Sequence, residues 1–172
     1  LSLQQLSVYD ATGKTLSVAA GRISYVLGLA GPCSAVDTAC SSSLVALHSA
    51  RRSLQLGECD IALVACEGIL TASSSIACAV AGMTSADGRC HTFDEDSKGY
   101  GRGEGACAVV LKRKDDAIKS ASPSYAIVRG SAVAQDGRSA SLTAPNGLAQ
   151  AQLLRSALQD AGIHPDDVNF IE

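Results

Sequence analysis

The sequence contains very few aromatic residues. Among its 172 residues there is no Trp, with two Phe and four Tyr, although 47% of the residues are hydrophobic. A chain of this length can form one domain with a sizeable hydrophobic core. Because bulky rings are nearly absent, we expect that core to consist of Ala, Val, Leu and Ile, which suit close packing of helices on a sheet.

Several other features are absent, and each excludes a class of protein. No apolar run reaches the roughly 18 residues of a membrane-spanning helix, and no charged and then apolar signal peptide opens the chain. The net charge is only −3, and no basic patch is interleaved with aromatic residues, so we expect no nucleic-acid partner. The seven cysteines include no Cys-x-x-Cys pair, which argues against a zinc site.

The seven cysteines are scattered through the chain, several of them in apolar segments. We interpret most of them as small core residues in a reducing compartment, not as a disulfide framework. The cytoplasm is therefore the default location, and an organelle address lost with a missing N-terminus is the alternative. The chain opens with Leu1 and stops at Glu172 inside a predicted strand, so we expect it to be an internal piece of a longer protein.

One segment has a pattern that indicates nucleophilic chemistry. Residues 35–36 predict a short buried strand, residues 37–39 a turn, and the apolar spacing after Ser41 a helix that stops at Gly57. Cys40 is then at a strand-to-helix turn, in the first turn of the helix. Free N–H groups at a helix N-terminus stabilise a thiolate, and the Cys40 N–H can bind an oxyanion. The alternative is a small buried cysteine beside a Ser-rich cap.

The rest of the chain alternates predicted strands and helices. The apolar run Ile61–Cys66 predicts a central strand, and with residues 35–36 and the intervening helix it predicts a βαβ unit of parallel strands. The other predicted elements are helices within 21–27, 112–124 and 149–161, the last stopped by Gly162, and strands at 106–111, 125–133 and 168–171.

Charged and histidine side chains near Cys40 have simple interpretations. His48 follows Cys40 by eight residues, about 12 Å along a helix, so it cannot bond the sulfur and we interpret it as a structural histidine. We expect Arg51 and Arg52 to be solvated charges on the exposed side of the helix.

The glycines of residues 99–105 lack Gly-x-Gly-x-x-Gly spacing and precede a strand, which argues against a nucleotide site.

Two motifs resemble a known family. The segment Val-Asp-Thr-Ala-Cys-Ser-Ser-Ser-Leu-Val-Ala-Leu-His at 36–48 resembles the active-site signature of beta-ketoacyl synthases, in the form found in type I polyketide synthases. The Asp-Gly-Arg, Thr-Phe-Asp and Gly-Tyr-x-Arg-Gly-Glu-Gly pattern within 87–105 is similar to another ketosynthase segment. The resemblance covers nearly all of the chain. It implies an α/β, thiolase-like αβαβα fold, with residues 1–114 in the first half and residues 125–172 opening the second.

The resemblance also implies a function. Cys40 would take an acyl group from the phosphopantetheine thioester of an acyl carrier protein, and a malonyl-type thioester would then lose carbon dioxide and attack that acyl group. Glu104 matches a position that helps to organise the family's site, and a structural carboxylate that accepts backbone hydrogen bonds is the alternative. No metal, nucleotide or directly bound cofactor is implied.

Partners and alternatives follow from the same resemblance. The family dimerises through an edge strand beside the nucleophile, here residues 35–39, so we expect a homodimer. The two histidines and the lysine of the family's second stage would lie beyond Glu172, so we expect this piece alone not to complete condensation. Residues 67–81 lack the family's usual Gly-Gly turn and bulky residues. Two alternatives stay open: a condensing domain of fatty-acid biosynthesis, and a catalytically silent copy that only binds acyl carriers or an active partner.

Overall fold

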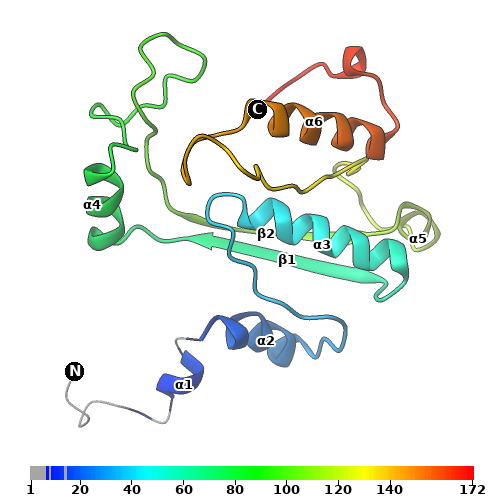
Figure 1. Ribbon diagram of the computed structural model, residues 1–172. Helices are drawn as coiled ribbons and strands as arrows, with labels where there is room; N and C mark the ends of the chain where they lie inside the picture. The colour runs from blue at the N-terminus through cyan, green and yellow to red at the C-terminus, as the bar shows by residue number, and fades with distance from the viewer. Residues whose placement is uncertain (1–6, 8, 14) are drawn as a thin grey trace. The chain divides into compact units, whose positions relative to one another are not determined.

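The computed structural model describes residue 7, residues 9–13 and residues 15–172. The chain divides into two compact units, Leu1–Val64 with Val110–Glu172, and Ala65–Val109. Figure 1 shows its elements, which in chain order are the helices α1 (Asp10–Gly13), α2 (Leu16–Leu27) and α3 (Ser42–Leu56), strand β1 (Ile61–Gly68), helix α4 (Ala72–Val80), strand β2 (Gly105–Lys112), helices α5 (Lys114–Lys119) and α6 (Gly147–Ala161), and the 3-10 helix η2 (Pro165–Asp167).

The two long helices, α3 and α6, confirm the helices that we predicted from apolar spacing and from the glycines that follow them. Helix α3 ends before Gly57 and helix α6 ends before Gly162. Both glycines adopt the left-handed conformation, with φ of 75° and 64°, which lets their N–H groups bond the last carbonyls of each helix. The predicted helix around residues 21–27, the short helix after residue 112 and the strand around 106–111 are likewise confirmed as α2, α5 and β2.

Three predicted strands are wrong. Residues 35–36, 125–133 and 168–171 have no strand structure, although their apolar character suits one. A strand exists only where a neighbouring strand bonds its backbone, and within the described part of the chain the one sheet has two strands, β1 and β2, which run in opposite directions (Figure 1). Because residues 35–36 form no strand, the predicted parallel βαβ unit is also wrong.

The apolar core is much smaller than we predicted from composition. Among the described residues, the buried apolar side chains are Leu54 and Val64, which are 5% and 6% exposed. Many large apolar side chains, such as Tyr25 and Leu148, lie in solvent. Directional polar contacts also join these elements to one another.

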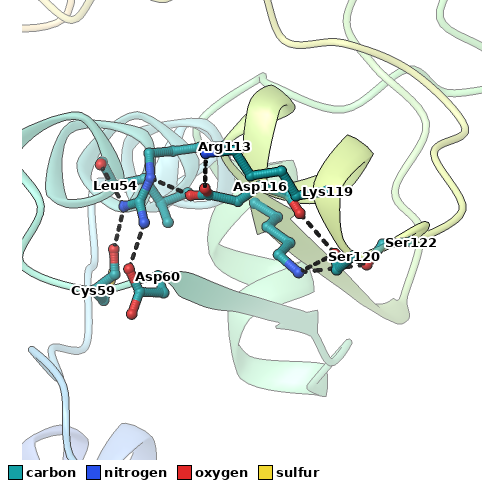
Figure 2. Close-up of polar contacts among 9 residues, drawn as sticks. Leu54, Cys59, Asp60, Arg113, Asp116, Lys119, Ser120 and Ser122 are labelled. Carbon is teal, nitrogen blue, oxygen red and sulfur yellow. Dashed lines mark hydrogen bonds and ion pairs between the residues drawn. The ribbon is translucent and has the colours of Figure 1, made fainter.

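Arg113 provides one group of such contacts, at the end of α3 (Figure 2). Its Nη1 donates to the carbonyls of Leu54 at 3.0 Å and Cys59 at 2.8 Å. Its Nη2 donates to the Asp60 carboxylate and its Nε to Asp116 at 2.6 Å. The hydrogen bonds that Arg113 donates to Asp60 and then to Asp116 raise the pKa of Arg113. The cation thus joins α3, the start of β1 and α5, and it complements the negative C-terminal end of α3.

The close approach of Gly130 to α6 yields a first prediction. A Cβ atom added at Gly130 would lie 2.5 Å from the Ala161 nitrogen and 2.7 Å from the Ala157 carbonyl oxygen. Because both are backbone atoms, we expect Gly130→Ala to lower the free energy of unfolding by about 1–3 kcal/mol. Chemical unfolding of the full-length protein measures this loss.

The matched control is Gly147→Ala. A Cβ atom there meets nothing within 4 Å, and alanine favours a helix more than glycine does, so stability should hold or rise. Equal stability of the two variants would contradict the close approach of Gly130 to α6.

Candidate active site

Cys40 lies in a tight turn directly before α3. Ala39 adopts a φ of 56°, a left-handed conformation that residues other than glycine rarely take. The Asp37 carboxylate accepts the N–H of Ala39 at 3.0 Å and supports this conformation. The first helical residue is Ser42, with Ser41 as the N-cap. The prediction that Cys40 lies in the first turn of the helix is therefore wrong: Cys40 precedes the helix by two residues.

Hydroxyl groups around Cys40 close the turn. The N–H of Thr38 donates to Ser42 Oγ at 2.8 Å, and Ser42 Oγ donates to the Ala39 carbonyl at 2.6 Å. Ser41 Oγ donates to the Thr38 carbonyl at 2.9 Å. These bonds tie the turn to the first residues of α3, so the turn and the helix form one unit.

The same turn presents Cys40 to solvent. Its thiol is free and exposed, and Ala35 before it is exposed as well, so the prediction of a buried strand leading into Cys40 is wrong. Thr38 and Cys40 form an isolated β-bridge within this turn. The site therefore presents an exposed thiol beside its own backbone N–H, and thiols and backbone N–H groups are of the kinds used in acyl transfer.

One face of α3 is held by a polar cluster. His48 Nδ1 lies 2.9 Å from Ser131 Oγ, which confirms His48 as a structural histidine. Arg51 Nη1 and Arg52 Nη2 reach the two carboxylate oxygens of Asp160 on α6, at 2.6 and 2.9 Å. The Arg51 side chain is only 12% exposed, so the prediction that it is a solvated charge is wrong, whereas the Arg52 side chain is 43% exposed and still partly solvated. Their partner lies more than a hundred residues later in the chain, where helical spacing cannot reveal it.

The surroundings of Asp160 stabilise its ionised form. The Ser131 N–H donates to its Oδ2 at 2.9 Å. This backbone bond, followed by the hydrogen bond from Arg52 and the charges of Arg51 and Arg52, lowers the pKa of Asp160 to about 2. The carboxylate is therefore ionised at any pH at which the cluster is expected to work.

Glu104, the other candidate site residue, belongs to the unit Ala65–Val109, whereas Cys40 belongs to the other unit. Its Oε2 accepts the backbone N–H of Leu70 at 2.9 Å. Glu104 also lines an open hollow of about 580 Å³, together with Glu67, Gly68, Ile69, Gly105 and Ala106. The geometry thus favours the alternative of a structural carboxylate, placed beside a hollow that is mostly apolar.

Neither a metal-binding cluster nor a membrane-spanning helix is found in the described part of the chain. No three His, Cys, Asp or Glu side chains there lie close enough to hold a metal ion. No helix among the described residues is long and apolar enough to cross a membrane.

Comparison with known proteins gives two family matches. The model of "Beta-ketoacyl synthase, N-terminal domain" matches residues 2–117, and that of "Beta-ketoacyl synthase, C-terminal domain" matches residues 125–172. A phenolphthiocerol/phthiocerol polyketide synthase polypeptide of Mycobacterium tuberculosis is 50% identical over 172 residues, which are 99% of this chain and 11% of that protein. A type I polyketide synthase of phenolphthiocerol synthesis from Mycobacterium bovis is 50% identical over 168 residues, 97% of this chain and 8% of that protein.

Solved structures match as well. The ketosynthase from module 6 of the bacillaene synthase of Bacillus subtilis has a TM-score of 0.89 and 43% identity, covering 93% of this chain and 29% of that one. A ketosynthase domain for oxazolomycin from Streptomyces albus has a TM-score of 0.86 and 37% identity, covering 90% and 28%. The fold is therefore thiolase-like α/β, as the motifs implied. The chain belongs to the beta-ketoacyl synthase family, and it spans about a tenth of the curated relatives that it matches.

The Asp160 cluster generates a prediction on pH. The pKa of this carboxyl falls from 3.8 to about 2 on folding, so its contribution to stability is present above about pH 4 and is lost as the pH falls toward 2. We expect Asp160→Asn to lower the Tm at pH 7, and the difference from the unmodified protein to shrink as the pH falls through that range. Thermal unfolding of the full-length protein and of the variant at several pH values measures this difference in Tm.

The control for charge alone is Asp115→Asn, since Asp115 is exposed on α5. It removes the same charge and should leave the Tm nearly unchanged. A Tm difference for Asp160→Asn that stays constant from pH 7 to pH 2 would contradict the ionic role of Asp160.

Proposed function

We propose that this chain is part of a ketosynthase of a type I polyketide synthase, and that Cys40 is its acyl-accepting nucleophile. The observation that carries the proposal is the exposed Cys40 thiol in a turn closed by hydroxyl groups, with its own N–H beside it. The polyketide synthase relatives at 50% identity and the ketosynthase structures support the same proposal.

The first proposed step loads Cys40. The sulfur attacks the carbonyl of an acyl thioester carried by the phosphopantetheine arm of an acyl carrier protein. A new carbon–sulfur bond forms, the bond to the carrier sulfur breaks, and the Cys40 proton passes to the departing thiol. The Cys40 N–H lies beside the oxyanion that forms in between and donates to it.

The second proposed step extends the chain. A malonyl-type thioester loses carbon dioxide, and the electron pair of the broken carbon–carbon bond remains on its α-carbon. That carbanion attacks the Cys40 thioester, a new carbon–carbon bond forms, and Cys40 leaves as the thiolate. Division of the reaction at a covalent intermediate is nucleophilic catalysis.

None of the histidines in the described structure is assigned to the second step. His48 bonds Ser131, His91 pairs with Asp87, and His164 caps η2. In the resembling family, two other histidines and a lysine serve the decarboxylation, and we propose the same for the full-length protein. Acyl carrier protein, a malonyl-type thioester and a second copy of the chain are the proposed partners.

We also propose that the chain contains two family halves, residues 1–114 and 125–172, joined through α5. The two family matches, to residues 2–117 and 125–172, support this division. Glu104 is proposed to organise the hollow that it lines by holding the Leu70 backbone. The cytoplasm stays the expected compartment.

The test compares Cys40→Ala with Cys33→Ala, because both cysteines are exposed and free. The full-length protein is incubated with an acyl N-acetylcysteamine thioester, and peptide mass spectrometry locates the acyl group. We expect acylation at Cys40 in the unmodified protein and in Cys33→Ala. In Cys40→Ala it should be absent, and condensation should fall by at least about a thousandfold.

Two outcomes would contradict the proposal. Acylation of Cys40→Ala at the normal rate would assign the nucleophile to another residue. Normal polyketide output from Cys40→Ala would instead identify a silent copy. Product analysis separates the fatty-acid alternative, since that pathway yields fully reduced chains.

A further inference from the structure

We propose that Asp160 is a positioning residue for Cys40 and acts on it through helix α3. This inference rests on the proposed role of Cys40 as the acyl nucleophile. Asp160 lies on α6, within the stretch that matches the family's C-terminal domain, and Cys40 and α3 lie within the stretch that matches the N-terminal domain. All of these residues belong to the same compact unit.

The Asp160 carboxylate binds two arginines of α3 at once. Its Oδ2 accepts from Arg51 Nη1 at 2.6 Å and its Oδ1 from Arg52 Nη2 at 2.9 Å. The Asp160 and Arg51 side chains are 21% and 12% exposed. Partly buried, charge-assisted hydrogen bonds of this kind fix direction as well as distance.

Ser131 extends these contacts along α3. Its N–H donates to Asp160 Oδ2 at 2.9 Å, and its Oγ lies 2.9 Å from His48 Nδ1. Arg51 Nη2 adds a bond to the Arg129 carbonyl at 2.9 Å. One carboxylate therefore organises contacts to two arginines and, through Ser131, to a histidine.

The three anchored residues of α3 define its rotation about the helix axis. His48, Arg51 and Arg52 are spaced i, i+3 and i+4, so their side chains share one face. Leu54 is buried and several apolar residues of α3 are half-buried, so apolar packing and the polar cluster act on the helix together. The cluster with Asp160 adds the directional contacts.

The turn that carries Cys40 moves with α3. Bonds from Thr38 to Ser42 and from Ser42 to Ala39 join the turn to the first residue of the helix. Arg51 follows Cys40 by about 16 Å along the helix axis, so Asp160 cannot touch the reacting atoms. It can change the direction of the Cys40 thiol only by holding the helix, and small displacements of a nucleophile are costly in rate.

The experiment uses the full-length protein with Asp160→Asn, Arg52→Gln and the control Asp60→Asn. Asp60 binds Arg113, which in turn bonds the Leu54 carbonyl at the C-terminal end of α3, so Asp60→Asn removes a carboxylate near the same helix without touching the cluster. For each variant, kcat and KM for acyl transfer to Cys40 are measured below the onset of thermal unfolding. Alkylation of Cys40 and Cys33 by iodoacetamide is followed by peptide mass spectrometry in parallel.

We expect Asp160→Asn to lower kcat about tenfold with little change in KM. Cys40 alkylation should slow by at least about threefold, and Cys33 alkylation should keep its rate. Arg52→Gln should lower kcat and Cys40 alkylation by a smaller factor, because Arg51 still binds Asp160. If Asp160→Asn does not fold, the rates of Arg52→Gln test the positioning role. Asp60→Asn should leave both Cys40 rates unchanged.

Unchanged kcat and unchanged Cys40 alkylation in the folded variants would overturn the inference and leave Asp160 a purely structural role. Equal rate losses in Asp60→Asn would overturn it as well. Absence of Cys40 acylation in the unmodified protein would instead refute the proposed function. The alkylation rates would still test the positioning role in that case, so the two failures are distinguishable.

Discussion

Charge-assisted hydrogen bonds to helix α3 are the interactions on which the rest of this structure depends. Arg113 holds the C-terminal end of the helix through the Leu54 carbonyl, and Asp160 holds one face through Arg51 and Arg52. Hydrophobic burial is non-directional, whereas charge-assisted hydrogen bonds fix direction as well as distance.

The helices and the candidate nucleophile were predictable because their signals are local. Apolar spacing followed by Gly57 or Gly162 specifies where a helix runs and stops, and the residues around Cys40 carry their own turn chemistry. The absence of strands at 35–36 and 125–133 was not predictable, because a strand depends on a neighbour elsewhere in the chain. The partner of Arg51 and Arg52 was not predictable for the same reason, since Asp160 lies on a helix that is distant in the sequence.

The polar cluster also joins the two stretches that match separate family domains. Residues 2–117 contribute His48 and the two arginines, and residues 125–172 contribute Ser131 and Asp160. A carboxylate with a pKa of about 2 keeps this junction charged over the whole neutral range. The first stretch contains Cys40 and the second holds the helix that follows it through Asp160 and Ser131.

The left-handed conformation of Ala39 has a consequence for protein engineering. Alanine adopts this conformation at a cost of about 1–2 kcal/mol, whereas glycine does so freely. A search for heat-resistant variants would therefore find glycine at this position attractive. The same substitution would give the backbone beside Cys40 more freedom and loosen the direction of its thiol. At position 39 a substitution that raises stability is therefore expected to lower the reactivity of Cys40.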